Sequence, residues 1–558
     1  MKNTYAIGLD FGSLSGRALL VNLQTGEEAG MAVMNYPHGF IEEKLPVTGE
    51  TLPPDWTLQD PADYLEVLTA IVPKVMAESG VDPEQVVGIG VDFTASTVMP
   101  VKRDGTPLAF LPEFKNNKHA YVKKWKHHAA QPYATKINEI GAKRGESFLK
   151  RYGEKISSEW LVPKAWQILD EAPEVYDGMD MIMEAGDWLV MQLTGELVRS
   201  SCGAGYKGLW SKRDGYPDKA FFKALDPRLE NFVEEKLIGD VKPLGAPAGK
   251  LTPEMADKLG LKAGTAVAMS IIDAHVAIPA VGIDGPNDML LIIGTSTCHI
   301  MMSENFVEAP GIAGIVEDGV LPGFTAYEAG QSCVGDHFDW FVSNLFPAHY
   351  AADAAEKGMN AHQYLRSLAE KQKPGEHGLL ALDWWNGNRS VLMDADLTGM
   401  MLGMTLQTRA EDIYRALLEA TAYGTREIIE TFEENGLEVK QLHAAGGIAL
   451  KDPLMMQIYA DVNNRSIEVS KSKQTPALGA AMFGAVAAGK ASGGFDTIQD
   501  AIASIPLPDS IRYEPIPENV KIYEQLYHEY KQLHDYFGRG GNDVMKRLKA
   551  LRERQLKA

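Results

Sequence analysis

Two glycine turns of this chain combine the small residues, hydroxyls and charge that binding a phosphate group requires. They are Asp10-Phe11-Gly12-Ser13-Leu14-Ser15-Gly16-Arg17 and Gly294-Thr295-Ser296-Thr297. Glycine lets several backbone N–H groups approach phosphate oxygens, the hydroxyls add donors, and Arg17 adds a positive charge. Asp10 ends a strand at the first turn, where a carboxylate can hold Mg²⁺ directly or through water. The alternative for each segment is an ordinary hairpin turn.

An acidic residue follows the apolar run Ile271-Ile272. A carboxylate at the polar end of a strand can accept the proton of an attacking hydroxyl during phosphoryl transfer. Asp273 is therefore the candidate general base, and an N-cap for the following helix is the alternative. His275 is expected to be structural.

A third glycine turn, Ala445-Gly446-Gly447, ends the predicted strand 441–445. Paired glycines there would let an adenine or an α-phosphate approach the backbone, although a plain helix-entry turn fits equally well.

Two other segments match known nucleotide-binding motifs only by accident. The segment 484–491 nearly fits a phosphate loop but lacks the final hydroxyl and ends an apolar helix. The triplet Asp10-Phe11-Gly12 has no H-R-D loop to accompany it.

The first two turns each connect two short apolar strands, 5–9 with 17–21 and 289–293 with 298–302. Because Gly12 and Gly294 lie roughly 280 residues apart, about half the chain, we expect a duplicated lobe with a connection near 281–287. The predicted domains are residues 1–283 with an insertion near 110–215, residues 284–490, and a helical tail at 491–558.

Periodicity predicts further elements around these turns. Helices are expected over 61–78 and 411–434, and a strand over 86–92. In the tail, aromatic and leucine side chains from Tyr523 to Phe537 recur at helical spacing, which predicts a packing face.

The bulk composition excludes several classes of protein. The chain has 558 residues, 45% of them hydrophobic, and a formal net charge of −21, which disfavours nucleic acid and anionic membranes as partners. The longest apolar stretch, 477–489, is too short to span a bilayer. Three dispersed cysteines and the absence of a leader-like N-terminus predict the cytoplasm. A homodimer is the expected assembly, although no sequence feature carries that expectation.

The motifs resemble those of the FGGY carbohydrate kinase family. The opening D-F-G-S-x-S-x-R is similar to the family's first phosphate motif, and the segments 399–404 and 412–419 are similar to its second signature. Lys164-Ala165-Trp166 keeps only the Lys-x-Trp core of its first signature. In the adenosine motif, Ala445 and Lys451 replace the usual acid and amide. The resemblance covers residues 4 to 490.

This resemblance implies an α/β fold with two actin-like, ribonuclease H-like lobes that close on ATP, Mg²⁺ and a sugar, with Asp273 as base. The nucleotide would contact Gly12, Ser13, Ser15, Arg17, Gly294, Thr295, Gly399, Gly446, Gly447 and Lys451, and Asp10 would assist the metal. In the branch of the family that phosphorylates L-ribulose, the sugar would contact Ala95 (backbone), Lys207, Asp273 and Glu328.

Several alternative interpretations exist. Lys207 can instead be a surface lysine and Glu328 a strand-edge charge. The substrate can be another ketopentose or polyol, such as xylulose or ribitol. An actin- or chaperone-like ATPase needs no sugar-directed base, so Asp273 disfavours it. A transcriptional sugar sensor is disfavoured because no basic segment precedes the first lobe.

Overall fold

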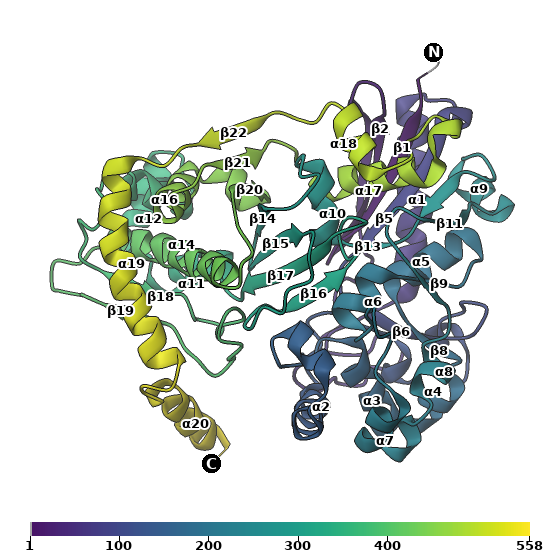
Figure 1. The fold of residues 1–558 in the computed structure, drawn as a ribbon, viewed down its shortest axis with the longest axis horizontal. Coiled ribbons are helices and arrows are strands. Elements are labelled where there is room, and N and C mark those ends of the chain that lie inside the picture. The colour runs from purple at the N-terminus through teal and green to yellow at the C-terminus, as the bar shows by residue number, and fades with distance from the viewer. Residues whose placement is uncertain (1–2, 558) are drawn as a thin grey trace.

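The computed structural model describes residues 3–557, which form two lobes that each contain a seven-stranded sheet (Figure 1). The first sheet contains β1 (Tyr5–Phe11), β2 (Ser15–Asn22), β3 (Glu28–Asn35), β5 (Val86–Phe93), β11 (Pro247–Lys250), β12 (Ala266–Ala268) and β13 (Ile271–Ile272). The second contains β14 (Asp288–Ile293), β15 (Thr297–Ser303), β16 (Gly314–Glu317), β17 (Thr325–Gln331), β20 (Gln441–Ala445), β21 (Ile467–Ser470) and β22 (Ser510–Tyr513).

The two sheets share one topology. The first has the order β11-β12-β5-β1-β2-β3, and the second contains the matching order β22-β21-β20-β14-β15-β17. In each, three strands form an antiparallel meander. Two strands then run parallel to the first strand of the meander, and an antiparallel strand follows them. The duplicated lobe predicted from the two hairpins is therefore confirmed.

Helices cover both sheets. The first half contains α1 (Pro61–Ser79), α2 (Gln131–Arg144), α3 (Leu161–Glu171), α4 (Pro173–Gly178), α5 (Ala185–Thr194), α6 (Ser201–Lys207), α7 (Lys219–Leu225), α8 (Phe232–Lys236), α9 (Pro253–Leu259) and α10 (Asp273–Ala280). The second half contains α11 (Gly335–Leu345), α12 (Ala348–Glu356), α13 (Ala361–Ala369), α14 (Ala410–Glu434), α15 (Gly447–Lys451), α16 (Pro453–Asn463), α17 (Thr475–Ala488), α18 (Ile498–Ser504), α19 (Pro517–Gly538) and α20 (Val544–Lys557). The predicted helices over 61–78 and 411–434 are confirmed. Within residues 3–557, no helix has both the length and the apolar character needed to cross a membrane.

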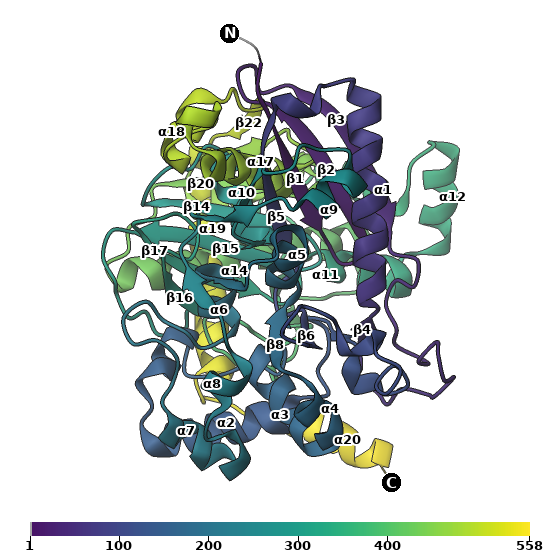
Figure 2. The same cartoon turned by 90° about the vertical axis from the view of Figure 1, so that its right-hand side faces the viewer.

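Alternation along β1 places helices on opposite faces of the first sheet. The Phe11 ring contacts Tyr64 of α1, which runs along the outside of the lobe (Figure 2). Gly8, three positions earlier, faces the other side of the sheet. There a Cβ would lie 1.7 Å from the backbone oxygen of Ala477 in α17. Helix α17 lies within 284–490 in sequence, yet it packs on the sheet of the first lobe.

Glycines make this close approach possible, and replacing one should destabilise the fold. A Cβ at Gly90 of β5 would lie 1.7 Å from the backbone oxygen of Ala480. Since backbone must move to relieve that contact, Gly90→Ala should cost about 3 kcal/mol or more of unfolding free energy. Gly285→Ala is the matched control, because nothing lies within 4 Å of its Cβ position. Thermal unfolding of both variants measures the difference; equal melting temperatures would contradict the expectation.

Helix α10 crosses α17 at an equally close contact. A Cβ at Gly479 would lie 1.8 Å from the backbone oxygen of Val276. Just before α17, Gln474 accepts a hydrogen bond from Arg17 at 3.2 Å, so this helix begins beside the first hairpin. Helix α10 begins at Asp273. The near-phosphate-loop at 484–491 is the end of α17, capped by Gly489, as the sequence predicted.

A third packed region is built from segments that lie on both sides of β5 in sequence. It is built on a four-stranded sheet of β4 (Leu58–Gln59), β7 (Val122–Lys123), β6 (Val98–Val101) and β8 (Met181–Glu184). Shorter strands elsewhere are β9 (Val198–Ser200) with β10 (Asp240–Lys242), and β18 (Leu380–Leu382) with β19 (Met400–Leu402). The region has its own buried core, which includes Trp56, Trp160 and Trp166. Strand β7 ends at Lys123, so the residue after it can reach the edge of the first sheet.

Candidate active site

Three aspartates meet at one edge of the first sheet. Strands β1 and β5 run parallel with Asp10 opposite Asp92. Strand β13 also runs parallel to β5, with Ile272 opposite Phe93, and Asp273 follows it directly. Because parallel strands present their carboxyl ends at the same edge, the topology itself brings the three carboxylates together.

The charges of these aspartates are poorly compensated by the protein. Asp92 is fully buried, and neither of its carboxylate oxygens has a hydrogen-bond donor. Burial raises the pKa of Asp92 well above its usual value, and the charges of Asp10 and Asp273 raise it further. Burial also raises the pKa of Asp10, although the Arg17 Nε lies 3.3 Å from its Oδ2. Such a cluster is suited to a cation.

Asp273 occupies a position suited to proton transfer. It is the first residue of α10, its Oδ1 accepts the N–H of Ala274 at 2.8 Å, and its side chain is partly exposed. Burial of the carboxyl, followed by the charge of Asp10, raises the pKa of Asp273 to about 6. The candidate base is thus the first helical residue, and the N-cap position belongs to Ile272, so the N-cap alternative for Asp273 is wrong.

Lys124 reaches this edge without any signal in the sequence. Its Nζ donates to Thr94 Oγ1 at 2.8 Å, and burial lowers the pKa of Lys124 to about 7. Its charge in turn lowers the pKa of Asp273. Lys164, from the altered signature, supports the same segment by donating to the carbonyls of Lys124 at 2.7 Å and Ser96 at 2.6 Å. Only the fold connects these lysines, because Lys124 follows β7 and Lys164 lies in α3.

A small cavity of about 20 Å³ lies against this segment. It is lined by Phe93, Thr94, Ala95, Glu184, Gly186, Asp187, Gly203, Lys207, Ser270, Ile271 and Ile272. Two of the predicted sugar contacts, Ala95 and Lys207, therefore line the same cavity. Asp273 follows directly after the lining residue Ile272.

An ion cluster joins the two lobes. Lys207, at the end of α6, places its Nζ 3.2 Å from Oε2 of Glu328 on β17. Glu328 also pairs with Arg389 and lies 3.2 Å from His275 Nε2. Burial alone would raise the pKa of Glu328, but Lys207, Arg389 and His275 hold it well below its usual value. Lys207 and Glu328 are thus neither a surface lysine nor a strand-edge charge, and Arg389 is a member of the cluster that sequence reasoning missed.

Both hairpin turns are present, and the structure explains their shapes. In the first, the Gly12 N–H donates to Ser15 at 3.0 Å, and Trp125 donates to Ser13 Oγ at 3.1 Å. In the second, the Gly294 N–H donates to Ser296 at 2.9 Å, which leaves Thr295 exposed.

The third glycine turn lies beside the second hairpin. Strands β14 and β20 are parallel, with Ile292 opposite Ala445, so both turns stand at one sheet edge. Gly446 has φ 108°, and a Cβ there would lie 2.4 Å from the Ile293 carbonyl oxygen. Gly447 is exposed at the start of α15. Only glycine fits at 446, and a flat group can approach the backbone at 447.

Two residues predicted to contact the nucleotide, Lys451 and Gly399, have contacts within the protein that do not indicate a nucleotide site. The side chain of Lys451 is exposed at the end of α15, and its carbonyl accepts a bond from Arg366. Gly399 packs against Trp385, where a Cβ would lie 2.2 Å from the ring. That packing alone requires glycine.

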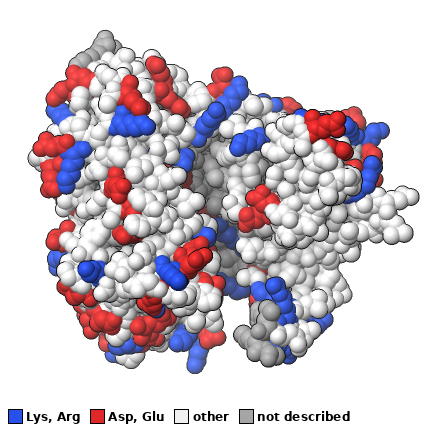
Figure 3. Space-filling view, turned by 180° about the vertical axis from the view of Figure 1, so that it is seen from behind, with Lys and Arg blue, Asp and Glu red and all other residues white. Residues whose placement is uncertain are grey.

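A deep hollow separates the two halves of the molecule, with basic side chains along its walls (Figure 3).

Comparison with known proteins gives a consistent result. Residues 5–280 match the N-terminal domain and residues 289–488 the C-terminal domain of the FGGY family of carbohydrate kinases. A ribulokinase of Halalkalibacterium halodurans is 56% identical over 555 residues, covering 100% of this chain and 99% of that protein. A ribulokinase of Mycolicibacterium smegmatis is 48% identical over 550 residues, covering 98% and 96%.

Solved structures share the fold at low sequence identity. A gluconate kinase from Lactobacillus acidophilus superimposes with a TM-score of 0.79 at 17% identity, covering 97% of this chain and 99% of that one. A xylulose kinase from Rhodospirillum rubrum gives 0.76 at 23% identity, covering 95% and 98%. The two-lobed sugar-kinase fold predicted from the motifs is confirmed.

Proposed function

Since the chain belongs to the FGGY family of carbohydrate kinases, we propose that it transfers the γ-phosphoryl group of ATP to L-ribulose, giving L-ribulose 5-phosphate. The proposal is carried by the ion cluster of Lys207 and Glu328, because Lys207 lines the same cavity as Ile272, the neighbour of Asp273, and the charge of Glu328 raises the pKa of Asp273. The ribulokinases that match at 48–56% identity over nearly the whole chain support the choice of sugar.

The experiment that tests it is ADP release with ATP and Mg²⁺ against a panel of pentuloses, pentoses and polyols. Strong turnover on L-ribulose is expected. Turnover only on xylulose or ribitol would keep the kinase and change the substrate. ATP hydrolysis indifferent to every sugar would favour an actin-like ATPase.

Mg²⁺ fits the three-aspartate edge. Asp92 is buried without a hydrogen-bond donor, and Asp10 faces it from the neighbouring strand. Carboxylate oxygens are the ligands that Mg²⁺ prefers, either directly or through water. We propose that Asp10 and Asp92 hold the ion. When bound, it would neutralise charge on the phosphate oxygens.

Other residues of the chain bind ATP, orient the sugar and accept the proton. The backbone at Gly12, Gly294 and Gly447 binds ATP, with the hydroxyls of Ser13, Ser15 and Thr295 and the charge of Arg17 near its phosphates. Lys207 and Glu328 orient the sugar hydroxyls, with the Ala95 backbone beside them. Asp273 accepts the proton of the attacking primary hydroxyl as the phosphoryl group transfers. Closure of the hollow excludes water, which would otherwise compete with the sugar.

The role of Asp273 predicts an acid limb in the pH–rate profile. Only the deprotonated carboxylate accepts a proton, and the pKa of Asp273 is raised to about 6. As pH falls through this value, kcat/KM for the sugar should decline by about tenfold per pH unit. Lys124 lowers that pKa, so Lys124→Met should move the limb to higher pH. Steady-state rates between pH 5 and 8 would show it, and an unmoved limb would assign it to another group.

We also propose a location and an assembly for the protein. We place the protein in the cytoplasm, where its three free cysteines would stay reduced. We also propose a homodimer, which sedimentation of the purified protein tests directly.

A further inference from the structure

Arg389 lies in a loop, residues 383–396. Several other side chains of this loop anchor it to neighbouring elements. We call this segment the arginine loop. Its Ser390 N–H donates to the Gly330 carbonyl at 3.0 Å, and the Gly330 N–H donates to Ser390 Oγ at 3.2 Å. A Cβ at Gly330 would lie 3.0 Å from Arg389 Nη1, so the guanidinium lies directly on β17. From there Arg389 reaches Glu328, two residues away on the same strand.

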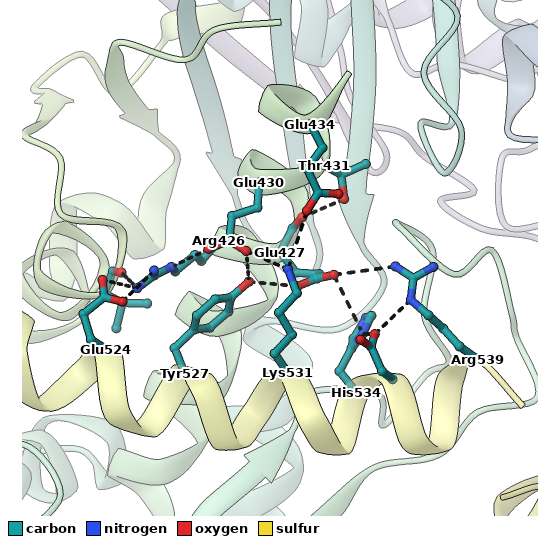
Figure 4. Close-up of polar contacts among 12 residues, drawn as sticks. Arg426, Glu427, Glu430, Thr431, Glu434, Glu524, Tyr527, Lys531, His534 and Arg539 are labelled. Atoms are coloured by element: carbon teal, nitrogen blue, oxygen red, sulfur yellow. Dashed lines mark hydrogen bonds and ion pairs between the residues drawn. The ribbon is translucent and has the colours of Figure 1, made fainter. Parts of the chain in front are cut away.

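Helix α19, beyond the residues that match the family domains, is docked firmly on α14. Tyr527 donates to Glu427 at 2.8 Å and to Glu430 at 2.9 Å, and Lys531 contacts Glu430 at 2.7 Å (Figure 4). The carboxylate of Glu427 also faces Arg539 at 3.7 Å. These contacts fix the position of α19 on the second lobe.

The same helix holds the first half of the arginine loop. Tyr530, fully buried, donates to Asp383 Oδ1 at 2.9 Å. Gln331 of β17 donates to the other oxygen of Asp383 at 2.8 Å. Asp383 is thus held between the tail helix and the strand that carries Glu328. Further along, Leu392 packs on Gly538, where a Cβ would lie 2.2 Å from it.

Helix α20 holds the second half of the loop. Lys546 pairs with Asp394 at 2.5 Å. Lys549 pairs with Asp396 and donates to the Ala395 carbonyl, both at 2.9 Å. Asp394 exchanges backbone hydrogen bonds with Asn388, the neighbour of Arg389, at 2.8 and 2.9 Å. A shift of Asp394 is therefore transmitted to Arg389 through one residue.

We propose that the C-terminal tail, residues 517–557, is a positioning element that holds Arg389 against Glu328 and thereby sets the affinity for the sugar. Tyr530 and Lys546 are its positioning residues. The proposal rests on the proposed role of Glu328 in sugar binding. It gives the tail, which lies beyond the matched residues 289–488, a part in the active site. If the tail only adds stability, its variants should lower the melting temperature without changing KM for the sugar.

The first test reverses the charge of Lys546. Lys546→Glu should raise KM for the sugar by about tenfold, because it displaces Asp394 and with it a charged contact to Glu328. KM for ATP should stay within about twofold, since Arg389 pairs with Glu328, a proposed contact of the sugar. Arg552→Glu is the matched control on the same helix, because the structure shows no ion pair for Arg552 among the described residues. The charge swap Lys546→Glu with Asp394→Lys should recover most of the affinity.

The second test removes one buried hydroxyl. Tyr530→Phe should raise KM for the sugar several-fold, while Tyr523→Phe should not. Tyr523 lies on the same helix and is equally buried, but it contacts Glu419 and Arg415 instead of the arginine loop. Equal KM values in the Tyr530 and Tyr523 variants, or no recovery in the swap, would overturn the proposal.

Hydrogen exchange of loop peptides separates this inference from the proposed function. Lys546→Glu should speed amide exchange in residues 383–396 and Arg552→Glu should not, whichever sugar is turned over. Failure of the wild-type protein to phosphorylate any pentulose would overturn the substrate and leave the exchange result standing. Unchanged exchange in Lys546→Glu would overturn the positioning role, even in an active ribulose kinase.

Discussion

Replacing Asp273 by alanine is expected to lower turnover by at least about a hundredfold, the scale of general-base catalysis, while the nucleotide still binds. Asp273 lies at the start of α10, at the sheet edge that it shares with Asp10 and Asp92. Its pKa of about 6 leaves it deprotonated at neutral pH. Nothing else at this edge combines a carboxylate, partial exposure and a free oxygen, within the part of the chain that the structure describes.

The measurement is kcat with saturating ATP and sugar, together with nucleotide affinity by calorimetry. Asp284→Ala serves as the control, because Asp284 is an exposed aspartate in the connection between the lobes. Near-normal turnover in Asp273→Ala would remove the base from the mechanism. Loss of both turnover and nucleotide binding would indicate that Asp273 acts on the metal or the fold instead.

The sequence predicted the parts of the site that rest on local pattern. Both hairpins and the strand before Gly446 are short apolar runs that end in glycine, and each forms where it was expected. Asp92 carried the same signal as Asp10, an acid at the end of an apolar strand, and that pattern could have identified it. The parallel pairing of β1 with β5 then follows from the duplicated topology.

Residues that depend on distant packing had no such signal. Arg389 reaches Glu328 from a loop 61 residues away in sequence, and Lys124 follows a two-residue strand. Helix α17 packs on the first sheet because Gly8, Gly88 and Gly90 leave room for its backbone, a match between segments at least 390 residues apart. Local propensity reports none of these contacts, because each is fixed only when both partners are folded.

His275, which the sequence predicted to be structural, also contacts the Glu328 cluster. Its ring packs on Tyr206 with centroids 4.3 Å apart, and its Nε2 lies 3.2 Å from Glu328. Burial lowers the pKa of His275, which favours its neutral form. The Glu328 carboxylate thus contacts three side chains, those of Lys207, Arg389 and His275, which together fix its position.

Replacing Glu328 by glutamine is expected to lower kcat/KM for the sugar by about a hundredfold, because it leaves the buried charge of Lys207 and the partly buried charge of Arg389 without a counter-ion. The amide also loses the charged acceptor that a sugar hydroxyl would use. KM for ATP should change little, since the phosphate turns lie on other strands. Steady-state kinetics with each substrate varied separately would show whether the loss falls on the sugar.

Glu317→Gln is the matched control for this change. Glu317 lies on β16, the neighbour of β17, and forms a second ion pair between the lobes, 2.9 Å from Arg213. Arg213 is more than half exposed, so this pair should contribute within about 1 kcal/mol and leave kcat/KM within a few-fold. Similar kinetics in the two variants would indicate that the Glu328 cluster only connects the two lobes. A large difference would show that burial and three converging partners, rather than contact between the lobes, make Glu328 part of the sugar site.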